Sequence, residues 1–449
     1  MYTNIFNYID EIEDEIINIR RDFHKYPETA WNEYRTASLI ARTLDDLGFE
    51  IYLGKDVIDE GSRMGLPTKQ VMKAEYNRAL NQGADRRFIE SLEGGFTGVV
   101  AELELNKEGI NLGFRFDIDA IPIDESKSDE HFPYKEEFCS FNEGIMHSCG
   151  HDAHASIGIG IAKALLNIKD ELKNIKKIKF IFQPAEEGVR GAKSMVEKGI
   201  IDDLDYLFAS HIGMIDSGSL VCGCNGFLSS TKIDARFKGE SAHAGGNPNE
   251  GKNALMGACN ASLNIMSIPR HKDGVTRINV GKIESGSTRN AIPKDAFMMI
   301  ETRGQTNKVN NYVKDKVINI LRSTALMYDL DLDIDIVGEA INCNSNSDLS
   351  QIIYDLANEI GLFENVIKED NKVKGSEDFT YMLNRMEERN KKSIYMIIGS
   401  NIKGGHHNSK FDIYEEDMIK AIKLYLAIIY KMDENIMSKN FDMKEILQK

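Results

Sequence analysis

The chain has 449 residues, of which 42% are hydrophobic and 28% charged, and its 55 basic and 71 acidic residues give a net charge of -16. This composition is typical of a folded globular protein, and the length favours two domains over one. The negative field disfavours nucleic acids and anionic membrane surfaces as partners.

Other global features narrow the class of protein further. No stretch approaches the roughly 20 apolar residues that a membrane-spanning helix needs, and the first residues lack a signal-peptide pattern. The six cysteines are irregularly spaced, which indicates reduced thiols rather than a disulfide framework. We therefore expect a cytoplasmic protein with no membrane contact.

The first half of the chain alternates between helical and strand patterns. Apolar residues at helical spacing predict an amphipathic helix over 5–23. Helical patterns such as 155–175 separate several of the β-rich apolar segments, which lie at 97–105, 110–118, 177–183 and 206–212. This alternation predicts an α/β catalytic domain with a largely parallel sheet.

One segment interrupts the pattern. Residues 53–95 contain no convincing strand, and 68–93 is charged and helical in character. We interpret this segment as a helical insertion, which would reshape a binding pocket if it lies near the mouth of the site.

From about residue 230 the order of elements changes. The pattern predicts a strand, a helix, two strands, a helix and a strand, at 231–239, 252–267, 276–284, 295–303, 307–328 and 331–338. The order β-α-β-β-α-β is that of a ferredoxin-like α+β unit. We therefore predict an inserted domain over 229–340 within a catalytic domain formed by 1–228 and 341–449, which closes with a helix at 415–431.

A dense cluster of metal-binding residue types follows the second predicted strand. His147, Cys149, His151, Asp152 and His154 fall within eight residues, beside a glycine that permits a tight turn. Chance and satisfied core histidines explain isolated cases, but this concentration of thiol, imidazole and carboxylate is typical of a transition-metal site.

Adjacent carboxylates occur where the strand 177–183 ends. Glu186 and Glu187 follow Pro184, and a turn there would direct both side chains into one cavity. One would bind a metal ion while the other takes a proton from water. Taken alone, the pair is equally typical of a solvated acidic turn.

Further polar residues follow other predicted strands. Asp117 and Asp119 end one strand and would supply either a ligand or a carboxylate that orients one. His211 ends another, and His406 and His407 form a glycine-flanked pair. No nucleotide-binding glycine loop and no G-x-S-x-G motif competes with these elements.

The predicted inserted domain carries polar residues in its loops. His243 lies among small residues, where it would be either a satisfied polar residue or a donor to a substrate oxygen. Arg289 and Asn290 are residue types that bind a carboxylate.

A set of motifs in fixed order carries a family resemblance. The motifs are FDIDAIP, HSCGHDAH, QPAEEG, SAHAGG, GSTRNAIP, GSEDF and HHNSKFD. Together they resemble the aminoacylase and carboxypeptidase-G family of metallopeptidases, in its Cys-containing amidohydrolase branch. The resemblance spans nearly the whole chain. The segments RRDFHKYPETAWNEYRTA, EGSRMGLP and EGGFTGVVA narrow it to members that act on aroyl-glutamates.

The resemblance implies a metal site and its chemistry. Two divalent metal ions would be bound, with manganese favoured and zinc possible on the chemistry of the ligands. Glu186 would serve as general base and then general acid in hydrolysis of an amide. The implied metal ligands are Cys149, His151, Glu187, His211 and His407.

The resemblance also assigns the remaining residues. His243 would reach the partner's active site in a dimer and stabilise the oxyanion, while Arg289 and Asn290 would bind the substrate carboxylate. Glu377 would lie close to the metal ions and contact the substrate. Asp119 would orient a ligand. Relatives outside this branch carry a histidine where this chain has Asp117, so that residue's role stays open.

The expected substrate is an N-acyl amino acid, with p-aminobenzoyl-glutamate preferred over other N-acyl amino acids and N-acetyl-diaminopimelate. The inserted domain would act as a dimerisation and lid domain, in a homodimer or in a heterodimer with a homologous B-type subunit. A mainly non-catalytic subunit is the alternative, disfavoured because Glu186 and all five implied ligands are present. A nucleobase deaminase is excluded, because no H-x-E precedes a P-C-x-x-C motif.

Overall fold

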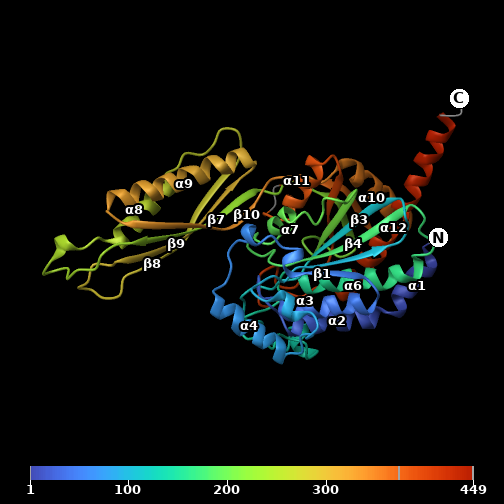
Figure 1. Cartoon of the computed structure of the whole chain (residues 1–449), viewed down its shortest axis with the longest axis horizontal. Helices are drawn as coiled ribbons and strands as arrows, with labels where there is room; N and C mark the ends of the chain where they lie inside the picture. Colours follow the sequence, from blue (N-terminus) through green and yellow to red (C-terminus); the bar gives the residue numbers. More distant parts are fainter. Residues whose placement is uncertain (1, 373–374, 447–449) are drawn as a thin grey trace.

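The computed structural model describes residues 2–372 and 375–446. Residues 1, 373–374 and 447–449, which all fall in the predicted catalytic domain, lie outside the described residues. Figure 1 shows two units, a larger one around a broad sheet and a smaller one that projects from it. In the described part of the chain, no helix combines the length and apolar character needed to cross a membrane.

The larger unit is built on an eight-stranded mixed sheet with the order β1-β2-β4-β3-β5-β12-β6-β11. Its strands are β1 (Glu50–Leu53), β2 (Val99–Glu104), β3 (Ile110–Asp117), β4 (Ile175–Gln183), β5 (Tyr206–Ile212), β6 (Ser219–Cys224), β11 (Asn365–Asp370) and β12 (Lys392–Ile398). The central strands β4, β3, β5 and β12 run parallel to one another. Strand β2 pairs antiparallel with β1 and β4, β6 pairs antiparallel with β12, and β11 runs parallel to β6. The predicted α/β class with a mostly parallel sheet is confirmed.

Helices cover both faces of this sheet. One face packs against α1 (Thr3–Glu11), α2 (Glu13–Lys25), α3 (Tyr34–Asp46), α6 (His151–Ile168), α10 (Ser347–Ile360) and α12 (Glu415–Ile446). The other carries α7 (Ala192–Glu197) and α11 (Thr380–Glu388). The central helix α6 is apolar and buried along most of its length, because helices surround it as well as the sheet.

Two helix predictions need correction. The helix expected over 5–23 is broken into α1 and α2 at Ile12, whose backbone leaves the helical region. The helix expected over 68–93 is α4 (Lys69–Asn81), capped at Thr68, whose side chain accepts a hydrogen bond from Val71 N. It ends before Gly83, where φ is +92°. The rest of the insertion consists of short 3-10 turns at Gly54–Asp56, Glu60–Ser62 and Ile89–Leu92.

The smaller unit contains an antiparallel sheet with the order β10-β7-β9-β8. Its strands are β7 (Ser229–Lys238), β8 (Thr276–Ser285), β9 (Asp295–Gly304) and β10 (Asp331–Ala340). The helices α8 (Ala254–Met266) and α9 (Asn307–Met327) share an apolar core with this sheet. Each element predicted between 231 and 338 is present within three residues of its expected bounds.

Candidate metal centre

The polar strand ends of the larger unit open into a cavity of about 470 Å³. Most of the residues that line it have polar side chains, and several are of types that bind metal ions. They include Cys149, Glu186, Glu187, His211, Glu377, Tyr395, His406 and His407. Lys232 and Arg303 reach the same cavity from β7 and β9 of the smaller unit. The cavity therefore lies where the two units meet.

The start of α6 positions Cys149 and His151. Gly150 precedes the helix with φ +88°, and a Cβ there would approach Ile212 Cγ2 to 2.8 Å, so only glycine fits this close turn. His151 Nδ1 lies 2.9 Å from the carbonyl oxygen of Asp119 and must donate to it. In the neutral ring, Nε2 then carries the lone pair, and Nε2 has no hydrogen-bond partner among the described residues.

The turn after β4 directs Glu186 and Glu187 into the cavity. Ala185 adopts φ +55° and Gly188 φ +83°, so the chain reverses within a few residues. Both carboxylate oxygens of Asp119 accept hydrogen bonds at 3.0 Å, one from Glu186 N and one from Glu187 N. A buried side-chain carboxylate from Glu33 accepts a third, from Ala185 N at 2.8 Å. These acceptors fix the backbone that carries the adjacent glutamates.

His211 and the pair His406–His407 close the other side of the cavity. Cys149 Sγ lies 3.4 Å from His211 Nε2 and 3.6 Å from His406 Nδ1. His407 Nε2 lies 3.2 Å from Glu187 Oε1. The five residues implied as ligands thus fall into overlapping groups whose ligand atoms lie within 4.8 Å of one another: Cys149–His151–His211, Cys149–Glu187–His407 and His151–Glu186–Glu187.

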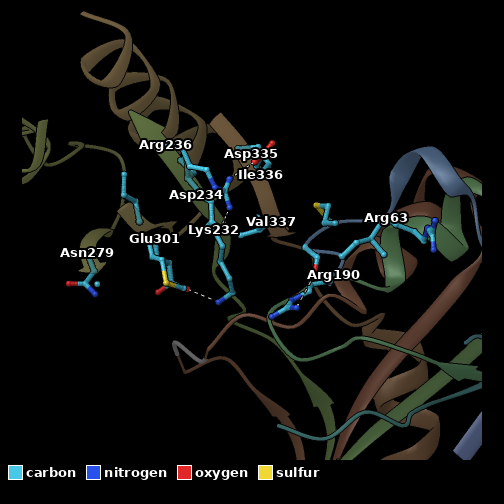
Figure 2. Close-up of a pocket in the computed structure, with 17 residues that line it drawn as sticks. Arg63, Arg190, Lys232, Asp234, Arg236, Asn279, Glu301, Asp335, Ile336 and Val337 are labelled. Carbon is cyan, nitrogen blue, oxygen red and sulfur yellow. Dashed lines mark hydrogen bonds and ion pairs between the residues drawn. The ribbon is translucent and has the colours of Figure 1, made fainter. Parts of the chain in front are cut away.

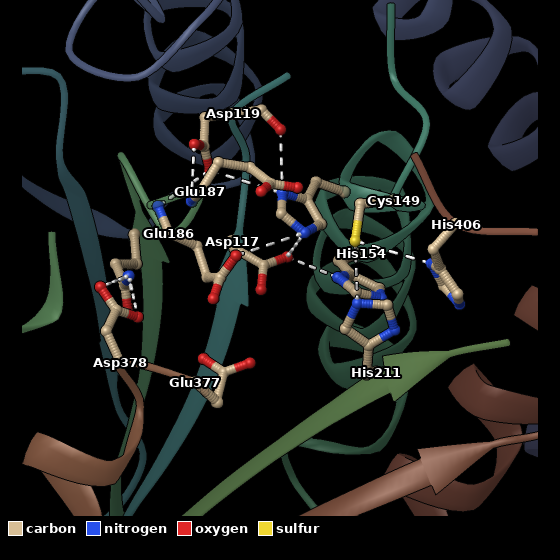
Figure 3. A network of polar contacts seen from close by, with 12 residues as sticks. Asp117, Asp119, Cys149, His154, Glu186, Glu187, His211, Glu377, Asp378 and His406 are labelled. Carbon is tan, nitrogen blue, oxygen red and sulfur yellow. Dashed lines mark hydrogen bonds and ion pairs between the residues drawn. The ribbon is translucent and has the colours of Figure 1, made fainter. Parts of the chain in front are cut away.

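His154 and Asp117 belong to a supporting network rather than to the open cavity (Figure 3). His154 Nδ1 bonds to Asp117 Oδ1, and His154 Nε2 accepts a hydrogen bond from Ile212 N at 2.9 Å, so both ring nitrogens are engaged. The other oxygen of Asp117 bonds to Arg115 Nη1 at 2.6 Å. Burial alone would raise the pKa of Asp117, but His151, Arg115 and His154 hold that pKa well below its usual range.

Arg115 was not anticipated from the sequence as part of the site. It is fully buried in β3, and its Nη2 also lies 3.1 Å from Glu377 Oε1 and 3.2 Å from Asp378 Oδ1. Tyr395 donates its hydroxyl to the second oxygen of Glu377 at 2.6 Å. Glu377 thus lies in the cavity, as expected, but both of its carboxylate oxygens already accept hydrogen bonds from the protein.

The electrostatics of the cavity favour positive charge. Burial raises the pKa of Glu186 well above its usual value, and the nearby carboxylates of Glu377, Glu187 and Asp378 raise it further. His407, hydrogen-bonded to Cys149 and Glu187, has its pKa raised to about 10. Several anionic groups that lie close together contribute to both raised pKa values, and a bound cation would reduce the repulsion among them.

The three remaining predicted residues lie elsewhere. His243, Arg289 and Asn290 are exposed in loops of the smaller unit, and none of them lines the cavity of their own chain. In Figure 1 the loop that joins β7 to α8 lies at the end of the smaller unit farthest from the large sheet. His243 Nδ1 accepts hydrogen bonds from Gly245 N and Gly246 N at 3.2 and 2.9 Å, which leaves the ring proton on Nε2.

Comparison with known proteins places the chain among peptidases and amide hydrolases. The model for peptidase family M20/M25/M40 matches residues 113–431. Indole-3-acetyl-aspartic acid hydrolase of Enterobacter agglomerans is 40% identical over 93% of this chain and 95% of its own length. The A-type subunit of the p-aminobenzoyl-glutamate hydrolase of Escherichia coli K12 is 39% identical over the same shares. The structure of an aminobenzoyl-glutamate utilization protein from Klebsiella pneumoniae matches with a TM-score of 0.82 and 35% identity, covering 95% of this chain and 97% of that one.

Proposed function

This chain belongs to peptidase family M20/M25/M40 and is a hydrolase that acts on amide bonds, and from that premise we propose that it cleaves N-acyl derivatives of acidic amino acids, with p-aminobenzoyl-glutamate as the preferred substrate. The observation that carries the proposal is the placement of Glu186 in a cavity lined by four of the potential metal ligands, with the fifth, His151, grouped beside Glu186 and Glu187. The named activities of the similar hydrolases support the choice of substrate.

The donor set fits two divalent cations. His151 Nε2 is buried without a hydrogen-bond partner among the described residues, and it belongs to the groups of potential ligand atoms together with Cys149, Glu187 and His211. Cys149, His151, Glu187, His211 and His407 would hold the ions. One thiolate, three imidazoles and a carboxylate suit manganese or zinc, and we favour manganese. Two such ions supply Lewis acidity, which polarises an amide carbonyl and makes water more acidic.

The residues of the chain then account for proton transfer. Glu186 accepts a proton from the attacking water at a carboxylate oxygen and delivers it to the nitrogen of the leaving amino acid. Asp119 keeps Glu186 and Glu187 in position through their amides, and its carbonyl fixes the tautomer of His151. We propose a supporting role for Asp117, since its carboxylate is occupied by Arg115 and His154.

We further propose that residues 229–340 form a ferredoxin-like dimerisation and lid domain, and that 1–228 and 341–449 form the catalytic domain. Exposed apolar side chains on α8 support an interface there, with Met256, Leu263 and Met266 each at least 47% exposed. In a homodimer, or with a B-type subunit, His243 would donate from Nε2 to the oxyanion in the other chain. Arg289 and Asn290 would bind the α-carboxylate of the substrate.

The reaction is tested by release of p-aminobenzoate from p-aminobenzoyl-glutamate by the purified chain. We expect this substrate to have a higher kcat/KM than N-acetyl-cysteine and N-acetyl-diaminopimelate under the same conditions. Equal or higher rates with either comparison compound would refute the substrate preference while leaving amide hydrolysis in place.

The trans role of His243 is tested by mixing two inactive variants. We expect His243→Ala and Glu186→Gln homodimers each to be nearly inactive, and mixed dimers to regain activity at one intact site out of two. Mass spectrometry under native conditions verifies that subunits have exchanged. Verified mixed dimers that remain as inactive as their parents would show that His243 does not act across the dimer.

A further inference from the structure

A second cavity of about 700 Å³ adjoins the metal centre. It lies between Arg63–Leu66 of the helical insertion and the face of the small sheet that is not covered by α8 and α9 (Figure 2). Lys232 of β7 lines both this cavity and the metal-centre cavity, so the two spaces share a wall. A substrate held at the metal centre can therefore extend past Lys232.

Arg190 lines this second cavity and, like Arg63, forms no ion pair among the described residues. Its Nη1 donates to the carbonyl oxygen of Gly65 at 3.2 Å, and its Nε is buried without a partner among the described residues. Arg236, on the β7 side of the cavity, is instead paired with Asp335 at 2.7 Å. Asp234 interacts electrostatically with Arg190, but its carboxylate forms an ion pair with Arg236 at 3.6 Å. Arg190 therefore retains donor capacity for a ligand anion.

The position of Arg190 relative to the reacting groups is fixed by the backbone. Arg190 N bonds to Ala185 O at 3.1 Å, which closes the same turn that carries Glu186 and Glu187. Asp378 accepts hydrogen bonds from Gly191 N and Ala192 N at 3.0 and 2.9 Å directly after it. The guanidinium thus extends from a rigid turn into the neighbouring cavity.

Lys232 supplies a second cation on the opposite wall. Its Nζ lies 2.9 Å from Glu301 Oε1, but Arg303 also bonds to that carboxylate, so two cations share one acid. Figure 2 shows the side chains of Lys232 and Arg190 extending from different units toward the same side of the cavity. The local excess of positive charge matches a carboxylate.

We propose that Arg190 and Lys232 bind the side-chain carboxylate of the amino acid half of the substrate and so select glutamate or aspartate. This inference rests on the proposed function and extends it from the amide bond to the amino acid. The two similar hydrolases are named for an aspartic acid and a glutamate conjugate, each of which carries such a second carboxylate. A planar guanidinium pairs with a carboxylate through two parallel hydrogen bonds, whereas the neutral amide of glutamine offers it a single acceptor oxygen.

The test compares p-aminobenzoyl-glutamate with p-aminobenzoyl-glutamine, in which a neutral amide replaces the side-chain carboxylate. We expect Arg190→Ala to lower kcat/KM for the glutamate compound about 10- to 100-fold, mainly through KM, and to change it less than about threefold for the glutamine compound. Arg190→Lys, which keeps the charge, should restore part of the loss. Arg236→Ala serves as the control and should leave the preference unchanged, since Arg236 is held by Asp335.

An equilibrium measurement keeps this proposal separate from catalysis. Calorimetric titration of the metal-loaded protein with free glutamate and free glutamine should show tighter binding of glutamate, with the difference lost in Arg190→Ala. Equal binding of both amino acids by the wild-type protein, or an equal loss for both substrates in Arg190→Ala, would overturn the proposal. Absence of hydrolysis together with retained preference for glutamate would refute the proposed reaction but not this subsite.

Discussion

Replacing Glu186 by glutamine is expected to lower kcat for amide hydrolysis by about 10²- to 10⁴-fold while the protein keeps its metal ions. The amide of glutamine fills the same space, and the backbone of residue 186 stays bonded to Asp119. Only the ability to accept and deliver a proton is lost. The raised pKa of Glu186 suits this task, because a carboxylate with a higher pKa accepts a proton more readily before it delivers that proton as an acid.

The control for this variant is Glu108→Gln, an isosteric change at an exposed position between β2 and β3. Metal content is measured by plasma mass spectrometry and KM by steady-state kinetics for both variants. We expect Glu108→Gln to match the wild-type protein in every respect. A metal-replete Glu186→Gln protein with a near-wild-type kcat would remove Glu186 from the mechanism.

Replacing Arg115 by methionine is expected to destabilise the protein by about 3–5 kcal/mol. Arg115 is fully buried and bonds to three carboxylates, from Asp117, Glu377 and Asp378. A neutral side chain would leave these acids buried without their common cation, since methionine fills much of the volume but donates no hydrogen bond. Arg115→Met should also lower activity, because Glu377 and Asp117 both border the metal centre.

Urea unfolding of metal-free protein measures this effect without interference from bound ions. Arg86→Met provides the control, because Arg86 is exposed in the insertion, where such a substitution usually changes stability by less than about 0.5 kcal/mol. An Arg115→Met protein that unfolds within about 1 kcal/mol of the wild type would show that the buried carboxylates do not depend on Arg115.

The elements of the fold that carry a clear local pattern were predictable. The strands β7 to β10 alternate between buried and exposed side chains along part of their length, and their bounds were close to those expected. The strand β12 was not identified, because Lys392–Ile398 is a short apolar run whose periodicity does not distinguish a strand from a buried helix. Its place between β5 and β6 depends on contacts about 180 residues apart in the chain, which no local pattern encodes.

The metal-binding residue types were predictable for a different reason. Cys149 and His151 belong to a dense cluster of metal-binding residue types, and Glu187 follows closely after a predicted strand. Their convergence at one edge of the sheet could therefore be inferred from the parallel strand order. Arg115 offered one signal, a charged residue inside the apolar strand 110–118, which is typical of a buried ion pair. Arg190 offered none, because its distinctive feature is the absence of an acidic partner among the described residues of the folded chain.

The most direct test of the central claim is a metal titration of chelated protein in which bound metal and p-aminobenzoate release are measured on the same samples. The two-ion centre predicts that activity is absent after chelation, returns with added manganese or zinc, and reaches its maximum when about two ions are bound per chain. Activity that survives removal of all metal ions, or metal binding that leaves the chelated protein inactive toward every N-acyl amino acid tried, would contradict the account.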